Sequence, residues 1–418
     1  MGFFNTKKLE TGRMKVVLLV VILVVALAIL IKKNVDNPIL TQSGENKAEV
    51  VNVKNNTSPI RNTADPRSCE IKSLQKKSVQ GMEAYSPDGK KYVLNKEDSN
   101  GVGQIYLGTV GKSDLKCITC TQLAGGPAPS RYKTQATWHP SGKWIIFSVE
   151  RDEYTKPPII GESREFIEGM IRSGLFVNTW AMDAKGEKWF QLTDFKDPKW
   201  GETSPNGITG PIFSKSGKRA VWSQIVDGNI LAYSPFGRWE LILSDFDDKD
   251  GVPKLVNRKN ITPTGMHWNE PGNFGPDENI FIFTGSDLKD QQGMDQYLFD
   301  IRSSKLTNLT NSPTVWDEHG RLSPDGKKVI FMTAYPYRSD PNSSKVLSIK
   351  TDFMMMDSDG KNLKQITHFR TAGYPESSEG IAANGEWNSD GSGAQLRQLV
   401  FPNYVDWAVE FDGPCGKQ

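Results

Sequence analysis

The sequence predicts an all-β fold, a six-bladed β-propeller, preceded by a single N-terminal transmembrane helix. Glycine and proline are abundant, with 38 and 24 copies, as expected of many short strands joined by tight turns. A short phrase also recurs six times, in which a turn rich in Pro, Ser, Asp and Gly precedes a β-rich run. A repeat at intervals of about 50 to 75 residues is typical of units that cannot cover their own apolar faces and pack side by side around an axis.

The six copies of the phrase define the blades in chain order. They read Tyr85-Ser-Pro-Asp-Gly-Lys, Trp138-His-Pro-Ser-Gly-Lys, Phe213-Ser-Lys-Ser-Gly-Lys, Phe274-Gly-Pro-Asp-Glu-Asn, Leu322-Ser-Pro-Asp-Gly-Lys and Trp387-Asn-Ser-Asp-Gly-Ser. In each copy the turn residues allow a tight reversal, with Gly free to take a positive φ. The turn therefore joins the innermost strand of a blade to its second strand.

The N-terminal segment is predicted to lie outside the propeller. Residues 16–31 form an unbroken run of 16 apolar residues flanked by lysines. A helix of this length rises roughly 24 Å, less than a hydrocarbon core of ~30 Å, and Lys15, Lys32 and Lys33 can reach the headgroups to cover part of the difference. We therefore expect residues 1–33 to form a cytoplasmic stub and signal anchor, with the propeller on the extracytoplasmic side because the heavier basic flank is N-terminal.

A cleaved signal peptide is the alternative for this segment. Ala26-Leu-Ala28 has the small-x-small pattern of a cleavage site, but three further apolar residues and Lys32 come directly after it. Under both interpretations the propeller is exported. Residues 34–66 are rich in Asn, Lys, Thr, Ser and Glu and nearly lack aromatic residues, so we expect a flexible tether.

The strands of the first two blades are predicted from the β-rich runs. In the first blade they are expected at residues 83–86, 91–95, 104–109 and 116–122, and in the second at residues 144–149, 175–182 and 189–193. The outer strand has a recurring ending, namely Gln191-Leu-Thr193, Lys259-Asn-Ile-Thr262, Thr307-Asn-Leu-Thr310 and Lys364-Gln-Ile-Thr367. A β-sandwich of short strands is the alternative fold, but it does not account for the repeated turns and endings.

The last blade lacks a fourth strand in the C-terminal sequence. Strands are expected at residues 396–401 and 406–411, after which the chain ends at Gln418. Residues 69–74, before the first blade, have the character of a fourth strand, so we expect the N-terminal segment to complete the last blade within a propeller of residues 67–418. Cys69 and Cys415 should then lie close and form a disulfide, which an exported compartment permits.

Cys117 and Cys120 form a single C-x-x-C motif. There is no second pair to suggest zinc and no following His to suggest haem, and Thr121 comes next. A local disulfide or two small apolar strand residues are the expected interpretations, because a redox motif would open a helix.

The Ser-Pro-Asp-Gly phrase before a β run, with an Asp-x-x-Gly turn and a Leu-Thr ending, resembles TolB-like, WD40-like (PD40-type) propeller repeats over roughly residues 69–411. Ser86-Pro-Asp-Gly89 and Ser323-Pro-Asp-Gly326 match the phrase fully, whereas the third, fourth and sixth turns depart from it. The resemblance implies a six-bladed propeller whose outer strand comes from the N-terminus. It also implies a protein-interaction scaffold, although similar propellers occur beside serine-peptidase domains and as polysaccharide lyases.

Candidate ligand-binding residues gather in the loops that precede inner strands. These loops and the long insertions at residues 150–174 and 335–352 share one face, where binding usually resides. The candidates for the channel mouth are Trp200, His267, Trp268, Glu270, Trp316, Glu318, His319 and Glu379. The His and Glu side chains suit a divalent metal, an anion or a sugar, with Trp rings as stacking platforms. The alternative is structural, with the acids capping turns and the rings packed between blades.

Composition and motifs exclude several functions. The formal charge of +2 gives no basic face for nucleic acid, and the chain has neither a G-x-S-x-G elbow nor a phosphate-binding Gly motif. We therefore expect a membrane-anchored, monomeric, periplasmic or extracellular propeller without cofactor, which binds an envelope protein or polymer. The alternative is an enzyme, such as a metal-assisted polysaccharide lyase, with its site at the channel mouth around His267 and His319.

Overall fold

The computed structural model describes residues 69–77, 84–122, 124–151, 168, 171–172, 174–195, 207–227, 238–286, 293–345, 348–400, 403–412 and 415. No helix in these ranges is long and apolar enough to cross a membrane. The predicted anchor and tether, residues 1–33 and 34–66, lie outside the described residues, so both stay predictions.

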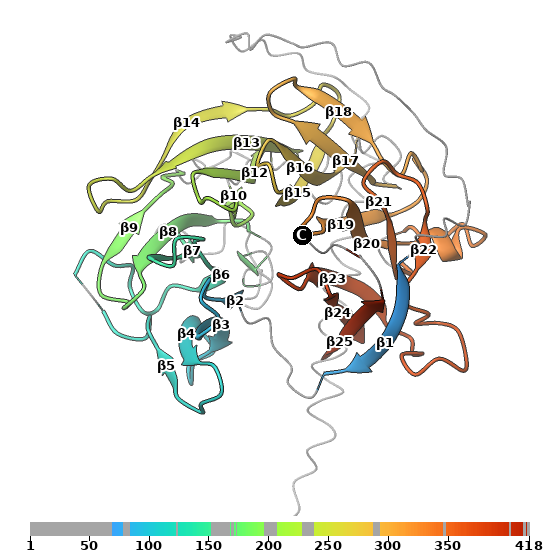
Figure 1. Cartoon of the computed structure of the whole chain (residues 1–418). Coiled ribbons are helices and arrows are strands. Elements are labelled where there is room, and N and C mark those ends of the chain that lie inside the picture. Colours follow the sequence, from blue (N-terminus) through green and yellow to red (C-terminus); the bar gives the residue numbers. More distant parts are fainter. Residues whose placement is uncertain are drawn as a thin grey trace, which may run out of the picture.

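The predicted six-bladed propeller is confirmed. Six antiparallel sheets surround a common centre, and the inner strands β2, β6, β10, β15, β19 and β23 face it (Figure 1). The first three sheets are blade I with β2 (Ala84–Tyr85), β3 (Lys91–Glu97), β4 (Gly103–Thr109) and β5 (Leu115–Cys117); blade II with β6 (Lys133–Trp138), β7 (Trp144–Glu150), β8 (Val177–Asp183) and β9 (Trp189–Gln191); and blade III with β10 (Gly207–Ile208), β11 (Ile212–Phe213), β12 (Arg219–Asp227), β13 (Arg238–Asp247) and β14 (Lys254–Asn260).

The remaining three blades have the same order from the centre outward. They are blade IV with β15 (Trp268–Phe274), β16 (Ile280–Ser286), β17 (Asp295–Asp300) and β18 (Lys305–Asn308); blade V with β19 (Asp317–Leu322), β20 (Lys328–Thr333), β21 (Asp352–Asp357) and β22 (Lys364–Gln365); and blade VI with β23 (Ile381–Trp387), β24 (Gly393–Val400), β25 (Asn403–Asp412) and β1 (Glu70–Lys76). A short 3-10 helix, η2 (Tyr335–Tyr337), begins the long loop of blade V.

Full copies of the turn phrase close by the same hydrogen bonds. In blade I the Ser86 hydroxyl donates to Asp88 Oδ1 at 2.7 Å and accepts from the Lys91 backbone N–H at 2.9 Å. The amide of Gly89 donates to the Ser86 carbonyl at 2.8 Å, with Gly89 at φ +67°. Blade V repeats this arrangement with Ser323 and Asp325. The sequence recurs because each of these residues is required to form the same tight turn.

The Leu-Thr ending also has a structural reason. The Thr hydroxyl at the end of the outer strand bonds to the polar side chain that begins the third strand, as Thr367 does with Asp352 Oδ1 at 2.8 Å. The same hydroxyl accepts the next backbone N–H, that of Phe353, at 2.9 Å. Equivalent bonds from a third-strand N–H recur in four other blades, at Thr119, Thr193, Thr262 and Thr310. The ending therefore fixes where the outer strand meets the third strand.

Apolar clusters join successive blades. Val93 of blade I shares a cluster with Phe147 of blade II, and Phe353 of blade V shares one with Leu396 and Trp407 of blade VI. Similar clusters join blades II and III, III and IV, and IV and V. Among the described residues no such cluster joins blade VI to blade I. The chain crosses this junction directly, since β1 of blade VI leads into β2 of blade I.

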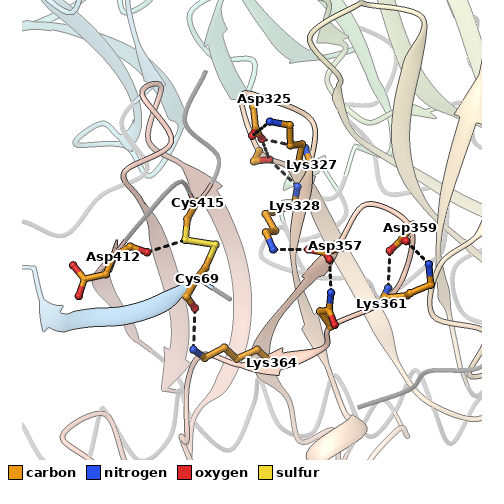
Figure 2. Close-up of polar contacts among 12 residues, drawn as sticks. Cys69, Asp325, Lys327, Lys328, Asp357, Asp359, Lys361, Lys364, Asp412 and Cys415 are labelled. Carbon is orange, nitrogen blue, oxygen red and sulfur yellow. Dashed lines mark hydrogen bonds and ion pairs between the residues drawn. A yellow bond between two sulfur atoms is a disulfide. The ribbon is translucent and has the colours of Figure 1, made fainter. Parts of the chain in front are cut away.

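The N-terminal strand completes blade VI as predicted. β1 pairs antiparallel with β25 from Glu70↔Asp412 to Lys76↔Trp407. The disulfide between Cys69 and Cys415 lies at the end of this pairing, with Cα atoms 5.4 Å apart (Figure 2). Lys364 Nζ of the neighbouring blade donates to the Cys69 carbonyl at 2.8 Å. Both cysteines are buried in the cluster of blades V and VI.

Cys117 and Cys120 also form a disulfide, with Cα atoms 5.7 Å apart. The strand expected at residues 116–122 is wrong in its extent, because β5 ends at Cys117. After Cys117 the backbone keeps one further bond to the sheet, from the Ile118 N–H to the Ile105 carbonyl at 2.9 Å, and the disulfide loop then ends at Cys120.

We expect Cys415→Ser to lower the free energy of unfolding by about 2–5 kcal/mol, because the lost disulfide joins residues with a sequence separation of 346. Chemical denaturation of oxidised wild-type and variant proteins measures this difference. The matched control is Cys120→Ser, which opens a loop with a sequence separation of only 3 and should cost less. A non-reduced digest of wild-type protein should contain the Cys69–Cys415 peptide, and free thiols at both positions would contradict the pairing.

Candidate functional site

The candidate site lies where inner strands β15 and β19 begin, on the face that carries the long insertions. The loop between β20 and β21 emerges on this face and contacts the start of β19. The backbone N–H of Ala334 donates to the Trp316 carbonyl at 2.9 Å, and the Trp316 N–H donates to Ser344 Oγ at 3.1 Å. The insertion of blade V is thereby attached to the residues that lead into the site.

Three of the predicted residues converge here. Glu270 comes from β15, and Glu318 and His319 come from β19. His319 Nε2 lies 3.5 Å from Glu270 Oε2 and 4.0 Å from Glu318 Oε1. The side chains of Glu270 and His319 are 27% exposed and that of Glu318 is 12% exposed, so solvent reaches the cluster only in part.

The repeat explains why the two glutamates meet. Glu270 pairs with Thr284 and Glu318 with Met332, so the glutamates occupy equivalent positions in adjacent blades. Trp268-Asn269-Glu270 and Trp316-Asp317-Glu318 are accordingly two copies of one pattern. Inner strands lie side by side around the axis, which brings equivalent side chains together.

A β-bulge explains how His319 joins them. Successive strand residues normally face opposite sides of a sheet, which would separate Glu318 from His319. The register of β19 against β20 shifts between Glu318 and Arg321, and His319 has φ +56°. A bulge re-aims the side chain of the extra residue. Gln135 of β6, at the corresponding position of blade II, also has a positive φ of 55°, so this bulge is a recurring feature of the ring.

Neighbouring groups fix the orientation of the cluster. Trp316 Nε1 donates to Glu318 Oε2 at 2.9 Å, which leaves Glu318 Oε1 directed to His319. His319 Nδ1 is hydrogen-bonded to the carbonyl of Ala383 in the inner strand of blade VI. Because that carbonyl only accepts, Nδ1 carries the proton. Three blades therefore contribute to the position of one imidazole.

The charges of the cluster are strongly linked. Burial disfavours the charged form of His319, but the carboxylates of Glu318 and Glu270 outweigh this effect and raise its pKa from 6.5 to about 9. Burial likewise opposes ionisation of Glu270, but the charge and hydrogen bond of His319 lower the pKa of that carboxyl. Burial raises the pKa of Glu318, and the charge of Glu270 reinforces the shift.

Asp317 points into the blade and does not take part. Its carboxyl accepts hydrogen bonds from Ser312 and Thr333. Burial raises the pKa of Asp317 to about 8, with a contribution from the nearby charge of Asp295. The hydrogen bonds to Ser312 and Thr333 hold Asp317 in place at the start of β19.

The other predicted residues lie elsewhere. His267 precedes β15 and is not in the cluster of Glu270, Glu318 and His319; its carbonyl accepts the Trp239 N–H at 2.7 Å. Trp316 is 6% exposed and Trp268 packs edge-on against Trp239, so these rings lie within the packed blades rather than forming open stacking platforms. Glu379 is 92% exposed and pairs with Arg370. Trp200 lies outside the described residues.

Two contributors were missed by the sequence reasoning. The Ala383 carbonyl orients His319, and no side-chain pattern reports a backbone group. Arg321 lies two residues after His319 and donates through Nε to Glu386 Oε1 at 2.8 Å. Arg321 could have been expected near the cluster from the sequence, because it lies on the same inner strand as Glu318 and His319.

No protein-family model matches the chain, and no curated protein matches it. Solved structures with a similar fold include the putative TolB from Agrobacterium tumefaciens, at 19% identity over 70% of this chain and 80% of that one, with a TM-score of 0.43. TolB from Acinetobacter baumannii shares 14% identity over 78% of this chain, which spans 64% of that protein, with a TM-score of 0.43. The β-propeller domain of the Trilobed protease from Pyrococcus furiosus shares 11% identity over 81% of both chains, with a TM-score of 0.44. These likenesses concern the fold alone.

We expect the imidazole of His319 to titrate near pH 9 in protein freed of metal by a chelator, and NMR titration of the His ring signals measures this pKa. A pKa raised above its ordinary value contributes stability below about pH 6.5 that is lost as the pH rises through about 9. The stability difference between wild type and His319→Gln should therefore shrink over that range. A His319 pKa at or below 6.5 would show that the glutamates do not govern this ring.

Proposed function

We propose that the chain is a membrane-anchored, extracytoplasmic propeller that binds a protein or an envelope polymer through its loop-rich face. The observation that carries the proposal is the insertion of blade V, which bonds through Ala334 and Ser344 to Trp316, just before β19. The resemblance of the repeats to TolB-like propellers, which usually serve as protein-interaction scaffolds, supports the same function. The alternative of a lyase centred on His267 and His319 is less favoured, because His267 is not part of the three-residue cluster.

The blade V insertion is held in shape by its own contacts. Tyr337 OH donates to Asp352 Oδ2 at 2.5 Å, and Lys350 Nζ pairs with Asp340 Oδ2 at 2.6 Å. The guanidinium of Arg338 lies over the Tyr335 ring, 4.0 Å from its centroid. A loop already fixed before binding loses less conformational entropy when a partner docks. The insertion of blade II, at residues 150–174, lies largely outside the described residues.

Export is supported by the cysteines. The two disulfides use all four cysteines, and the described structure holds no free thiol. Such bonds persist in oxidising compartments such as the periplasm or the cell surface. The apolar run at residues 16–31 supplies a means of attachment.

Replacing residues 338–349 with a short Gly-Ser linker should reduce partner capture by about tenfold or more, because it removes the preformed loop and its low entropic cost of docking while Tyr337 and Asp352 remain. Crosslinking in cell envelopes followed by quantitative mass spectrometry measures the captured partner. The control joins Asp359→Ser with Lys361→Ser, which form an ion pair (Figure 2) in the hairpin between β21 and β22. This hairpin lies at the opposite end of β21 from the insertion. Equal capture by all three proteins would refute the face assignment.

Full-length protein should sediment with membranes, and its propeller should be accessible to protease added from the extracytoplasmic side. Deleting residues 1–33 should release the protein from the membrane fraction, since the apolar run is the proposed anchor. N-terminal sequencing distinguishes an anchor from a cleaved signal peptide. A new N-terminus near Ala28 would contradict the anchor but not export, whereas a protease-shielded propeller would contradict export.

A further inference from the structure

We propose that Glu270, Glu318 and His319 bind one divalent transition-metal ion, of the zinc or manganese class, at the mouth of the central channel. Their ligating atoms all lie within 4.8 Å of one another. The proposal goes beyond the scaffold function and stands independently of it, because a metal site at the channel mouth needs no partner protein to form.

The distances suit a common ion better than direct pairing. Zinc holds imidazole nitrogen and carboxylate oxygen at ~2.0–2.2 Å, which places neighbouring ligand atoms roughly 3–3.6 Å apart. His319 Nε2 lies 3.5 Å from Glu270 Oε2 and 4.0 Å from Glu318 Oε1. A strong charged N–H···O bond would instead measure about 2.7–2.9 Å. A small inward movement of each side chain completes the site.

The second bond of each fixed ligand matches what metal sites require. A metal-binding His usually donates a hydrogen bond from the N–H of its other ring nitrogen to a carbonyl or carboxylate, and a metal-binding carboxylate is itself hydrogen-bonded. His319 Nδ1 bonds to the Ala383 carbonyl, so Nε2 faces the glutamates. Glu318 Oε2 is held by Trp316 Nε1 at 2.9 Å, so Oε1 faces the same space. Both ligands are therefore oriented before any ion arrives.

The charge and the donor set select the ion. Once His319 Nε2 has released its proton to bind the metal, two carboxylates and one neutral imidazole carry a net negative charge, which favours a divalent cation. The nearby cation Arg321 is turned toward Glu386, with its Nε 2.8 Å from Glu386 Oε1. Mixed nitrogen and carboxylate ligands suit zinc and manganese, whereas calcium prefers an all-oxygen shell of about six to eight ligands. Three protein ligands leave coordination positions for water or for a ligand carboxylate.

The backbone at His319 also agrees with a ligand role. Its φ of +56° puts a non-glycine residue in the left-handed region. His is among the residue types found there more often, but the conformation is uncommon and re-aims the side chain. At the equivalent bulge of blade II the residue is Gln135, whose Oε1 accepts from Ser148 Oγ and the Gly210 N–H at 3.0 Å each. The bulge in blade II thus places a side chain that accepts two hydrogen bonds, whereas the bulge in blade V presents an imidazole to the two glutamates.

Calorimetric titration of the untagged full chain, first freed of metal, with ZnCl2 and separately with MnCl2 tests the proposal. We expect one equivalent of at least one metal to bind with micromolar or tighter Kd. Glu270→Gln and His319→Gln should weaken binding by about tenfold or more, and Trp316→Phe roughly 10–100-fold, because it releases Glu318. Glu379→Gln, an exposed glutamate outside the cluster, should bind as wild type does.

A measurement on wild-type protein keeps the test independent of variants that fail to fold. Substoichiometric Mn²⁺ should selectively broaden the NMR signals of the His319 ring and leave those of His139, whose ring bonds to Ser141 and the Gly217 carbonyl, unchanged. No stoichiometric binding of either metal overturns the proposal. The proposal is also overturned if folded Glu270→Gln and His319→Gln bind the metal as tightly as wild type does. It is overturned as well if Mn²⁺ broadens the ring signals of His267 alone. None of these results would affect the loop-replacement test of the scaffold function.

Discussion

The antiparallel pairing of β1 with β25 is the interaction on which the rest of the structure depends. Every other pair of neighbouring blades shares a buried apolar cluster, but the described residues show none between blade VI and blade I. The chain passes from blade VI to blade I through β1, whose seven residues and the Cys69–Cys415 disulfide attach it to blade VI. Lys364 adds a bond from blade V to the Cys69 carbonyl. If β1 left the sheet, β25 would become an open edge of blade VI.

The cluster of Glu270, Glu318 and His319 depends on the spacing of adjacent inner strands. Glu270 and Glu318 meet only because equivalent positions of adjacent inner strands stay at a constant distance, and His319 is aligned by a carbonyl of blade VI. Glu270 and Glu318 lie 3.5 and 4.0 Å from His319, and all three side chains are partly buried. Removing these charged groups from water costs free energy. The propeller tolerates this arrangement because its blades hold the three side chains in place. These side chains make few hydrogen bonds with one another.

Most of the fold could be predicted from the sequence, because its repeats are local rules. Each residue of the turn phrase has a fixed hydrogen-bonding role in the turn, as Ser323 has with the Lys328 N–H. The Thr ending likewise has a fixed role, as in the bond from Thr367 to Asp352. The meeting of Glu270 and Glu318 could be predicted as well, since the blade register is set by the repeat. The roles of Trp316 and His267 could not, because the pattern does not report which way a ring points. The end of β5 at Cys117 and the bulge that brings His319 to the glutamates could not be predicted either, because the repeat does not specify where a strand ends or shifts its register.

Hydrogen–deuterium exchange of the oxidised full chain tests the closure of the ring most directly. If β1 is the outer strand of blade VI, the amides of the peptide covering Glu70–Lys76 should exchange slowly, at rates close to those of β25, and faster once the disulfide is reduced. Exchange of this peptide at the rate of an unstructured chain, while β25 stays protected, would contradict the account. It would show that the N-terminal strand does not close the propeller.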